Sequence, residues 1–407
     1  MPTYPELVEA YLKRQPPNPL KLEWIAKRGI SNIIVVPAIA EFENLETLLT
    51  SLINNKPDYF RNTLVIFVIN NNSTDSIEVK ESNKKSLNLL RSIIREKDLD
   101  NQIVQKVINS TLGIALIDAS SKGKELNEKD SGVGLARKTG LDIALTAFDY
   151  SINYKRILMW LDADCKVDKN YLNTVVDEFN NKKLFAATIN FSHDISVKNE
   201  LTKAIIPYEI FLRYYVLGLK YAKSPYAFHT IGSTIAIDHN AYIKAGGMNK
   251  KKAAEDFYFL QKVAKNYKID RINSTTVYPS SRHSWRVPFG TGRSVTRFLS
   301  KARNEFLLND PIVFDVLKEW LETFSDKKDT DTKNQINEAG KINKELQSFL
   351  KQRNFSGQWD NILRNSKNSR QVQYQKHIWF DGFKTFKLIH HLRDNVYPLI
   401  NMFDAVD

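Results

Sequence analysis

Short runs of β-branched and other apolar residues alternate with amphipathic stretches in the first part of the chain, and this alternation restricts the fold more than any other feature. Residues 32–37, 64–69 and 156–161 have the length and composition of buried strands. Residues 43–53 carry leucines at helical spacing, and 135–148 also favour a helix. Strands that alternate with helices predict an α/β fold with a mostly parallel, Rossmann-like sheet, helices on both faces and ligands at the carboxyl ends of the strands.

Beyond residue 298 the pattern changes to helices with apolar stripes. A stripe at Trp379, Phe383 and Phe386 predicts a helix that either docks on the main domain or lies on a membrane surface. We therefore expect an N-terminal extension, an α/β domain and a helical C-terminal region, at 1–30, 31–300 and 301–407. The remaining predicted elements are helices at 87–94 and 207–221 and strands at 102–108, 185–191 and 230–237.

The charge balance indicates an anionic partner. The chain has 59 Lys and Arg against 46 Asp and Glu, a formal net charge of +13, and nearly all of the excess lies before residue 301. Nucleic acid, a phosphate-bearing substrate and an acidic membrane face are all compatible with such an excess. With 42% hydrophobic residues, the composition is that of a globular protein and not of a disordered one.

Three features bear on the cellular location. The single cysteine, Cys165, excludes an internal disulfide and so favours the cytoplasm. No run of 18 apolar residues is present, which predicts that the chain does not span a bilayer. The first 20 residues lack the basic-then-apolar order of a secretion signal. We therefore expect a cytoplasmic protein that keeps its N-terminus.

Two carboxylates, Asp162 and Asp164, follow an apolar strand directly. Carboxylates at the end of a buried strand are costly unless a cation or hydrogen-bond donors satisfy them. Their alternate spacing suits Mg²⁺ or Mn²⁺, which shares its coordination sphere with substrate phosphates. A helix cap or a solvated loop is the alternative interpretation of such a pair.

Two further motifs open predicted helices. Glu255 and Asp256 follow a Gly-Gly turn, where the helix dipole favours acids in any protein and where an acid is also well placed to act as a base. Gly132 and Gly134 precede Arg137 and Lys138 at the start of another helix, a natural site for a phosphate or a carboxylate partner.

The motifs appear in a characteristic order. They are Val36-Pro-Ala-x-x-Glu41, Ile69-Asn-Asn-Asn-Ser-Thr-Asp75, Gly134-x-Ala-Arg137, Leu161-Asp-Ala-Asp164, Gly232-Ser-Thr, Gly246-Gly247 and Glu255-Asp256. In this order the chain resembles the inverting family 2 glycosyltransferases of GT-A fold, over roughly residues 30–300. The resemblance implies a GT-A fold and a metal-dependent enzyme that transfers a sugar from a nucleoside-diphosphate sugar to a hydroxyl of a glycan or lipid-linked glycan.

The resemblance also implies roles for individual residues. Asp164 is the expected principal ligand of Mn²⁺ or Mg²⁺, with Asp162 on the metal or the ribose, and Asp256 is the expected general base. The donor is expected to contact Pro37, Ala38, Glu41, Asn70, Asn71, Arg137, Asp162, Glu255 and Arg286. Many relatives have an aspartate in the turn where this chain has Asn70, Asn71 and Asn72, so the identity of the nucleotide base stays open, with UDP as first choice and GDP next.

Residues 281–293 are rich in cations and glycines. The resemblance makes His283 a candidate metal ligand, and Trp285 could stack on an acceptor sugar or only pack. Arg282, Arg286 and Arg293 are expected to clamp phosphate oxygens, the alternative being a solvated loop. Only Trp285 and Arg286 match the motif of processive relatives, so processive synthesis is not predicted.

Three alternative functions are compatible with parts of the sequence. A retaining GT-A transferase shares the sheet, as does a sugar-nucleotide pyrophosphorylase, which carries a Gly-rich loop with Arg and Lys after its first strand that residues 37–41 do not match. A nucleic-acid-binding protein would explain the charge but not the carboxylate pairs, so no nucleic-acid partner is expected. The acceptor is not predicted, and its lipid-linked form would involve peripheral contact with the inner face of a membrane.

Overall fold

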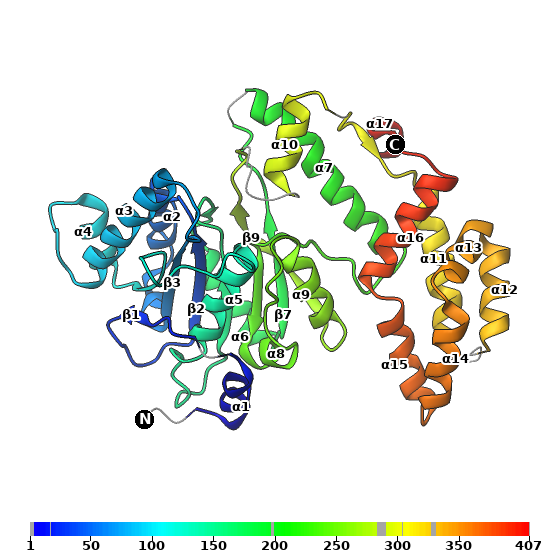
Figure 1. The fold of residues 1–407 in the computed structure, drawn as a ribbon, viewed down its shortest axis with the longest axis horizontal. Coiled ribbons are helices and arrows are strands. Elements are labelled where there is room, and N and C mark those ends of the chain that lie inside the picture. Colours follow the sequence, from blue (N-terminus) through cyan, green and yellow to red (C-terminus); the bar gives the residue numbers. More distant parts are fainter. Residues whose placement is uncertain are drawn as a thin grey trace. The chain divides into compact units, whose positions relative to one another are not determined.

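The computed structural model describes residues 4–16, 18–196, 199–282, 290–302, 304–326 and 331–406. These residues form two compact units, Met1–Thr202 with Thr230–Arg293 and Lys203–His229 with Ser294–Asp407. The first unit holds the sheet and the second is helical (Figure 1). This division differs from the boundaries expected from sequence, because most of helix α7 (Glu200–Tyr221) belongs to the second unit.

A nine-stranded sheet in the order β1-β4-β3-β2-β5-β8-β7-β9-β6 forms the centre of the first unit. β2, β3, β4, β5, β7 and β9 run in one direction, and β1, β6 and β8 run in the other. The prediction of an α/β fold with a mostly parallel sheet is therefore confirmed. The strands are β1 (Leu22–Trp24), β2 (Asn32–Ala38), β3 (Thr63–Asn70), β4 (Gly113–Ala119), β5 (Ile157–Trp160), β6 (Lys166–Val167), β7 (Ala186–Phe191), β8 (Ile235–Asp238) and β9 (Ile269–Tyr278).

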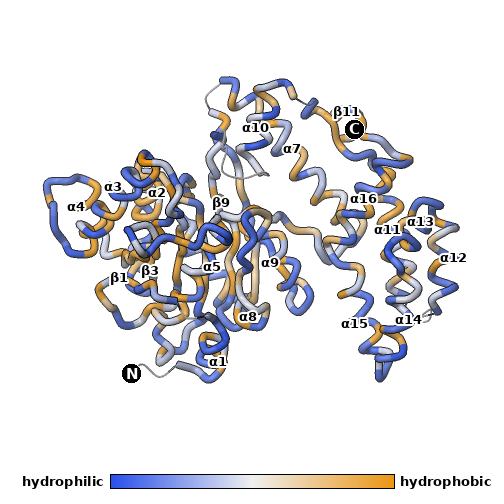
Figure 2. The backbone as a smooth tube through the Cα atoms, viewed as in Figure 1, coloured by the Kyte–Doolittle hydropathy of each residue, from blue (hydrophilic) through white to orange (hydrophobic). Residues whose placement is uncertain are grey.

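Helices cover both faces of this sheet. Residues of α2, α3, α4 and α6 share one apolar core with Val36 and Phe67, and hydrophobic residues line the strands (Figure 2). On the opposite face α5 lies so close that a Cβ on Gly140 would be 2.4 Å from Val35 Cγ1. The helices of this unit are α1 (Glu6–Arg14), α2 (Phe42–Ile53), α3 (Ile77–Ile94), α4 (Gln102–Ser110), α5 (Val133–Ala144), α6 (Tyr171–Asn181), α8 (His239–Lys244) and α9 (Glu255–Ala264), with a 3-10 helix at Pro57–Asn62.

The strand predicted at 102–108 is wrong, because that segment forms helix α4 and the strand follows as β4. The Asn101 side chain caps α4 by accepting hydrogen bonds from the N–H groups of Ile103 and Val104. Ile103, Val104 and Val107 are buried on one face at helical spacing. Their β-branched side chains suggested a strand, but the cap and the spacing decide for a helix.

The first 30 residues join the first unit. β1 pairs antiparallel with β4. The Tyr11 hydroxyl of α1 donates to Asp142 Oδ1 at 2.7 Å, and Gln15 Oε1 accepts a hydrogen bond from Lys138 Nζ at 3.0 Å. Both partners lie on α5, so the N-terminal segment is fastened to the helix that also carries Arg137.

The second unit confirms the helical C-terminal region. Its core is aromatic, and Trp379 contacts Phe355 edge to face at a centroid distance of 4.8 Å. Trp379 thus packs within its own unit, whereas the sequence suggested that its helix docks on the main domain or lies on a membrane.

None of the described helices is long and apolar enough to cross a membrane. The elements are α11 (Ile312–Ser325), α12 (Thr332–Ile342), α13 (Lys344–Gln352), α14 (Phe355–Asn365), α15 (Ser369–Trp379), α16 (Gly382–Asn395), α17 (Met402–Val406), β10 (Leu307–Leu308) and β11 (Ile400–Asn401), and α10 (Thr291–Leu299) begins in the first unit.

Candidate active site

The polar motifs follow strands whose carboxyl ends meet at one edge of the sheet. Ala38 pairs with Ile69 on β3, and Val35 pairs with Trp160 on β5, in parallel ladders. The turns after β2, β3 and β5 therefore leave the sheet side by side. Pro37 and Ala38 are buried as the last residues of β2. This edge is where open α/β sheets bind their ligands.

Arg137 joins two of the predicted motifs. Its Nη2 donates to Asp162 Oδ1 after β5, and its Nη1 donates to Glu255 Oε1 at the start of α9. The guanidinium is buried, with 2% of the side chain exposed. Burial alone lowers the pKa of Arg137, but Asp162, Glu255 and Asp256 outweigh that effect and raise it. Arg137 therefore stays charged and holds the two acidic motifs together.

Three glycines named by the sequence motifs permit this arrangement. A Cβ on Gly232 would lie 2.7 Å from Arg137 Nη1, so a larger residue there would displace the guanidinium. A Cβ on Gly134 would lie 2.1 Å from the carbonyl oxygen of Lys251, in the loop that precedes α9. Gly132 opens α5 as its N-cap. The predicted phosphate-type glycine motif thus allows α5 and the loop before α9 to approach closely.

Asp256 lies in the first turn of α9, in surroundings that disfavour its ionised form. Helix α9 begins at Glu255, after Ala254 in a left-handed conformation with φ of 56°. Burial, followed by the charge of Glu255, raises the pKa of Asp256 to about 7, while Arg137 works in the opposite direction. A carboxyl group with a pKa near neutrality can accept a proton and later release it at ordinary pH.

A second ion pair network surrounds Asp164. Arg282 Nε lies 2.9 Å from Asp164 Oδ2, and Arg282 Nη2 pairs with Glu41 Oε1. Burial and the neighbouring Asp162 raise the pKa of Asp164 to about 6, although Arg282 lowers it. Glu41, the N-cap residue of α2, is almost fully buried. Arg282 was expected to clamp phosphates, and here it pairs with one predicted donor-binding residue, Glu41, and with the predicted metal ligand Asp164.

The donor set at Asp162 and Asp164 fits a hard divalent cation. Burial and the charge of Asp162 disfavour the ionised form of Asp164 despite its pairing with Arg282, and a divalent cation would offset both effects. Carboxylate oxygens are the ligands that Mg²⁺ and Mn²⁺ prefer. No group of three or more His, Cys, Asp or Glu side chains that could hold a metal occurs among the described residues. The third expected ligand, His283, lies outside the described residues, as do Trp285 and Arg286. Metal binding therefore stays a prediction.

Asn70 and Asn71, the residues predicted to meet the base or ribose, are both buried. Asn71 Oδ1 accepts a hydrogen bond from Asn83 Nδ2 at 2.9 Å, and Asn71 Nδ2 donates to the carbonyl oxygen of Asn72 at 2.9 Å. Asn83, on α3, was missed by sequence reasoning. A single asparagine in a polar helical stretch does not by itself indicate a role in a binding site.

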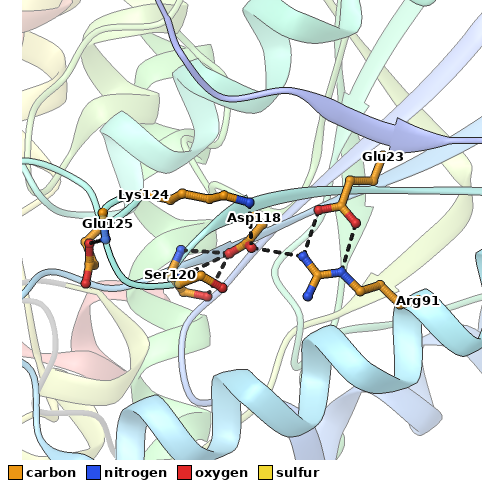
Figure 3. Close-up of polar contacts among 8 residues, drawn as sticks. Glu23, Arg91, Asp118, Ser120, Lys124 and Glu125 are labelled. Carbon is orange, nitrogen blue, oxygen red and sulfur yellow. Dashed lines mark hydrogen bonds and ion pairs between the residues drawn. The ribbon is translucent and has the colours of Figure 1, made fainter.

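Figure 3 shows a charged cluster around Asp118 that was not predicted, and Asp118 pairs in the sheet with Ile69, the residue before Asn70. Asp118, on β4, pairs with Arg91 at 2.9 Å and Lys124 at 3.2 Å, and Arg91 also pairs with Glu23 at 2.7 Å. Burial raises the pKa of Asp118, but hydrogen bonds from the backbone of Ser121 and from other donors lower it well below its usual range. The cluster secures the loop after β4.

Comparisons with known proteins give a likeness only among solved structures. No protein-family model and no curated protein matches the sequence. The chain is similar to S. aureus TarS 1-349 in complex with UDP-GlcNAc, with 14% identity, a TM-score of 0.42 and coverage of 90% of this chain and 92% of that chain. Another structure of S. aureus TarS has 15% identity and a TM-score of 0.39, and the match covers 77% of this chain and 48% of that chain.

Proposed function

We propose that this protein is a metal-dependent, inverting glycosyltransferase that moves a sugar from a nucleoside-diphosphate sugar to a hydroxyl of a glycan or lipid-linked glycan. The observation that carries the proposal is the position of Arg137 between Asp162 and Glu255. Asp162 belongs to the acid pair Asp162 and Asp164, which is expected to meet the donor diphosphate. Glu255 belongs to the acid pair Glu255 and Asp256, which contains the expected base. Arg137 bonds to both pairs. This contact supports the proposal because the expected diphosphate site and the expected base would then lie in one place.

Asp256 would act as the general base. The acceptor hydroxyl attacks the anomeric carbon from the face opposite the diphosphate, the new C–O bond forms, and the bond to the departing phosphate oxygen breaks. The hydroxyl proton passes to Asp256, whose pKa of about 7 suits this transfer. Attack from the opposite face inverts the configuration at that carbon.

Asp164, supported by Asp162, would hold Mn²⁺ or Mg²⁺. A bound divalent ion stabilises the negative charge that develops on the diphosphate as it leaves. Arg282 lies 2.9 Å from Asp164, and in the proposed function it would also bind the phosphate oxygens. These residues would act on charge that is larger in the transition state than in the bound donor, which is the condition for catalysis.

The donor base is proposed as uracil first and guanine next. The test is calorimetric titration of UDP, GDP, CDP and dTDP into the protein, each with and without Mn²⁺, repeated on Asp164→Ala. We expect one diphosphate to bind only with metal and the variant to lose that binding. Binding of none of the four to the wild-type protein under either condition would contradict the proposal.

The acceptor side of the proposal includes peripheral contact with an anionic membrane in the cytoplasm, which the net charge of +13 supports. Flotation with vesicles that contain anionic lipid tests this part. Protein that stays at the bottom of the gradient at low salt would refute membrane contact and leave soluble glycans as acceptors.

A further inference from the structure

One buried amide connects the two turns expected to hold the nucleotide. Asn83 lies on α3 with 1% of its surface exposed. Its Oδ1 accepts a hydrogen bond from the N–H of Ala40 at 2.9 Å. Its Nδ2 donates to the carbonyl oxygen of Asn70 at 3.0 Å and to Asn71 Oδ1 at 2.9 Å. The backbone partners fix the orientation of the amide, because Ala40 offers a donor and Asn70 an acceptor.

The turns that Asn83 joins belong to neighbouring strands. Ala40 follows β2 in a left-handed conformation with φ of 52° and directly precedes Glu41, the N-cap of α2. A non-glycine residue in this conformation needs support from its surroundings. Asn70 ends β3, the strand paired with β2. A single side chain therefore forms hydrogen bonds to both turns, one to the strained residue Ala40 and two to Asn70 and Asn71.

We infer that Asn83 is a positioning residue that sets nucleotide affinity by holding the turn at Ala40 and Glu41 against the turn at Asn70 and Asn71. The inference rests on the proposed function, since both turns are expected to border the nucleotide. Asn83 has no expected contact with the donor itself. It acts through the backbone of the residues that do.

The substitution Asn83→Asp isolates this role. It keeps the shape of the side chain and an oxygen for the Ala40 N–H, but it removes both N–H donors. The new carboxylate would face the Asn70 carbonyl oxygen and Asn71 Oδ1, two acceptors that repel it. The turn after β3 should move away from α3, whereas the sheet below it stays paired.

Asn55 offers a matched control. It is also a buried amide, with 4% of its surface exposed, at the end of α2. Its Nδ2 donates to the carbonyl oxygens of Ser51 at 3.0 Å and Asp168 at 3.2 Å, and its Oδ1 accepts from the Leu172 N–H at 2.8 Å. Asn55→Asp therefore loses the same two donors at a place where no predicted donor-binding residue is a partner.

The experiment measures the Kd of UDP and of GDP by calorimetry with Mn²⁺, together with Tm, for the wild type, Asn83→Asp and Asn55→Asp. We expect both variants to lose some Tm, but only Asn83→Asp to bind the nucleotide about tenfold or more weakly. Burial favours the protonated form of the new carboxyl groups, which could donate to one of these acceptors, so binding is measured at about pH 8, where that form is least populated. If Asn83→Asp does not fold, Asn83→Ser and Asn55→Ser make the same comparison.

The outcomes separate the two claims. Equal nucleotide affinity of the wild type and the Asn83 variant, or an equal loss in the Asn55 variant, overturns the inference and leaves the proposed function in place. Absence of binding to the wild type contradicts the proposed function and overturns the inference with it.

Discussion

The buried pair of Arg137 and Glu255 predicts a large and measurable coupling in stability. Replacing Arg137 with Met keeps most of the volume but leaves Glu255 buried without its cation, with 5% of the Glu255 side chain exposed. Breaking a buried pair in this way costs about 3–5 kcal/mol. The second partner, Asp162, is 38% exposed, so water can solvate its carboxylate when Arg137 is removed. Its contribution to the loss of unfolding free energy is therefore small. We therefore expect the Arg137→Met variant to lose about 3–5 kcal/mol of unfolding free energy.

A double-mutant cycle tests the reasoning. Glu255→Gln alone removes the negative charge and leaves the Arg137 cation with Asp162 as its remaining bonded partner. The double variant Arg137→Met/Glu255→Gln leaves no charge stranded at this pair, so its loss should be smaller than the sum of the single losses by about 1–3 kcal/mol. Urea unfolding, followed by circular dichroism, measures all four proteins. Losses that simply add would show that Arg137 does not neutralise Glu255, and would remove the central contact of the proposed site.

Three further predictions concern activity and the glycine beside Arg137. Asp256→Asn should lower turnover by roughly 10²–10⁴-fold with the Kd of the nucleotide unchanged, and full activity would refute the assignment of the base. Turnover of the wild type should fall as the pH drops below about 7, because Asp256 accepts a proton only when ionised; a flat profile from pH 5 to pH 8 would argue against it. Gly232→Ala places a Cβ 2.7 Å from Arg137 Nη1 and should lower stability by about 1–3 kcal/mol in urea unfolding, whereas an unchanged midpoint would show that the guanidinium has room to move.

Sequence patterns predicted the elements whose periodicity is strong. β2 and β3 lie where apolar runs of strand length occur, and α2 lies where leucines recur at helical spacing. The segment that became α4 was misread because Ile and Val dominate it, whereas its N-cap at Asn101 carries the better signal. Local sequence predicts a helix or a strand reliably only when the capping residue, the hydrophobic period and the residue types all indicate the same element.

The candidate site was predicted in its parts but not in its connections. The acid pairs at Asp162 and Glu255 are visible as motifs, yet their shared bond to Arg137 joins positions as far as 118 residues apart. Asn83 sits in a polar helical stretch, and only the fold shows that it meets Asn70. Such contacts depend on which helix packs on which strand, and no short window of sequence contains that information.

The first unit is discontinuous along the chain, and this affects how it can form during synthesis. β7 pairs with β8 and β9, both of which lie beyond Thr230, after the segment that joins the second unit. Until those residues leave the ribosome, β5 and β7 present open edges. The ion pair between Glu41 and Arg282 also cannot form until Arg282, 241 positions later in the chain, has been synthesised. The growing chain therefore passes through a long stage with an incomplete sheet, in which contact with other chains is the main hazard.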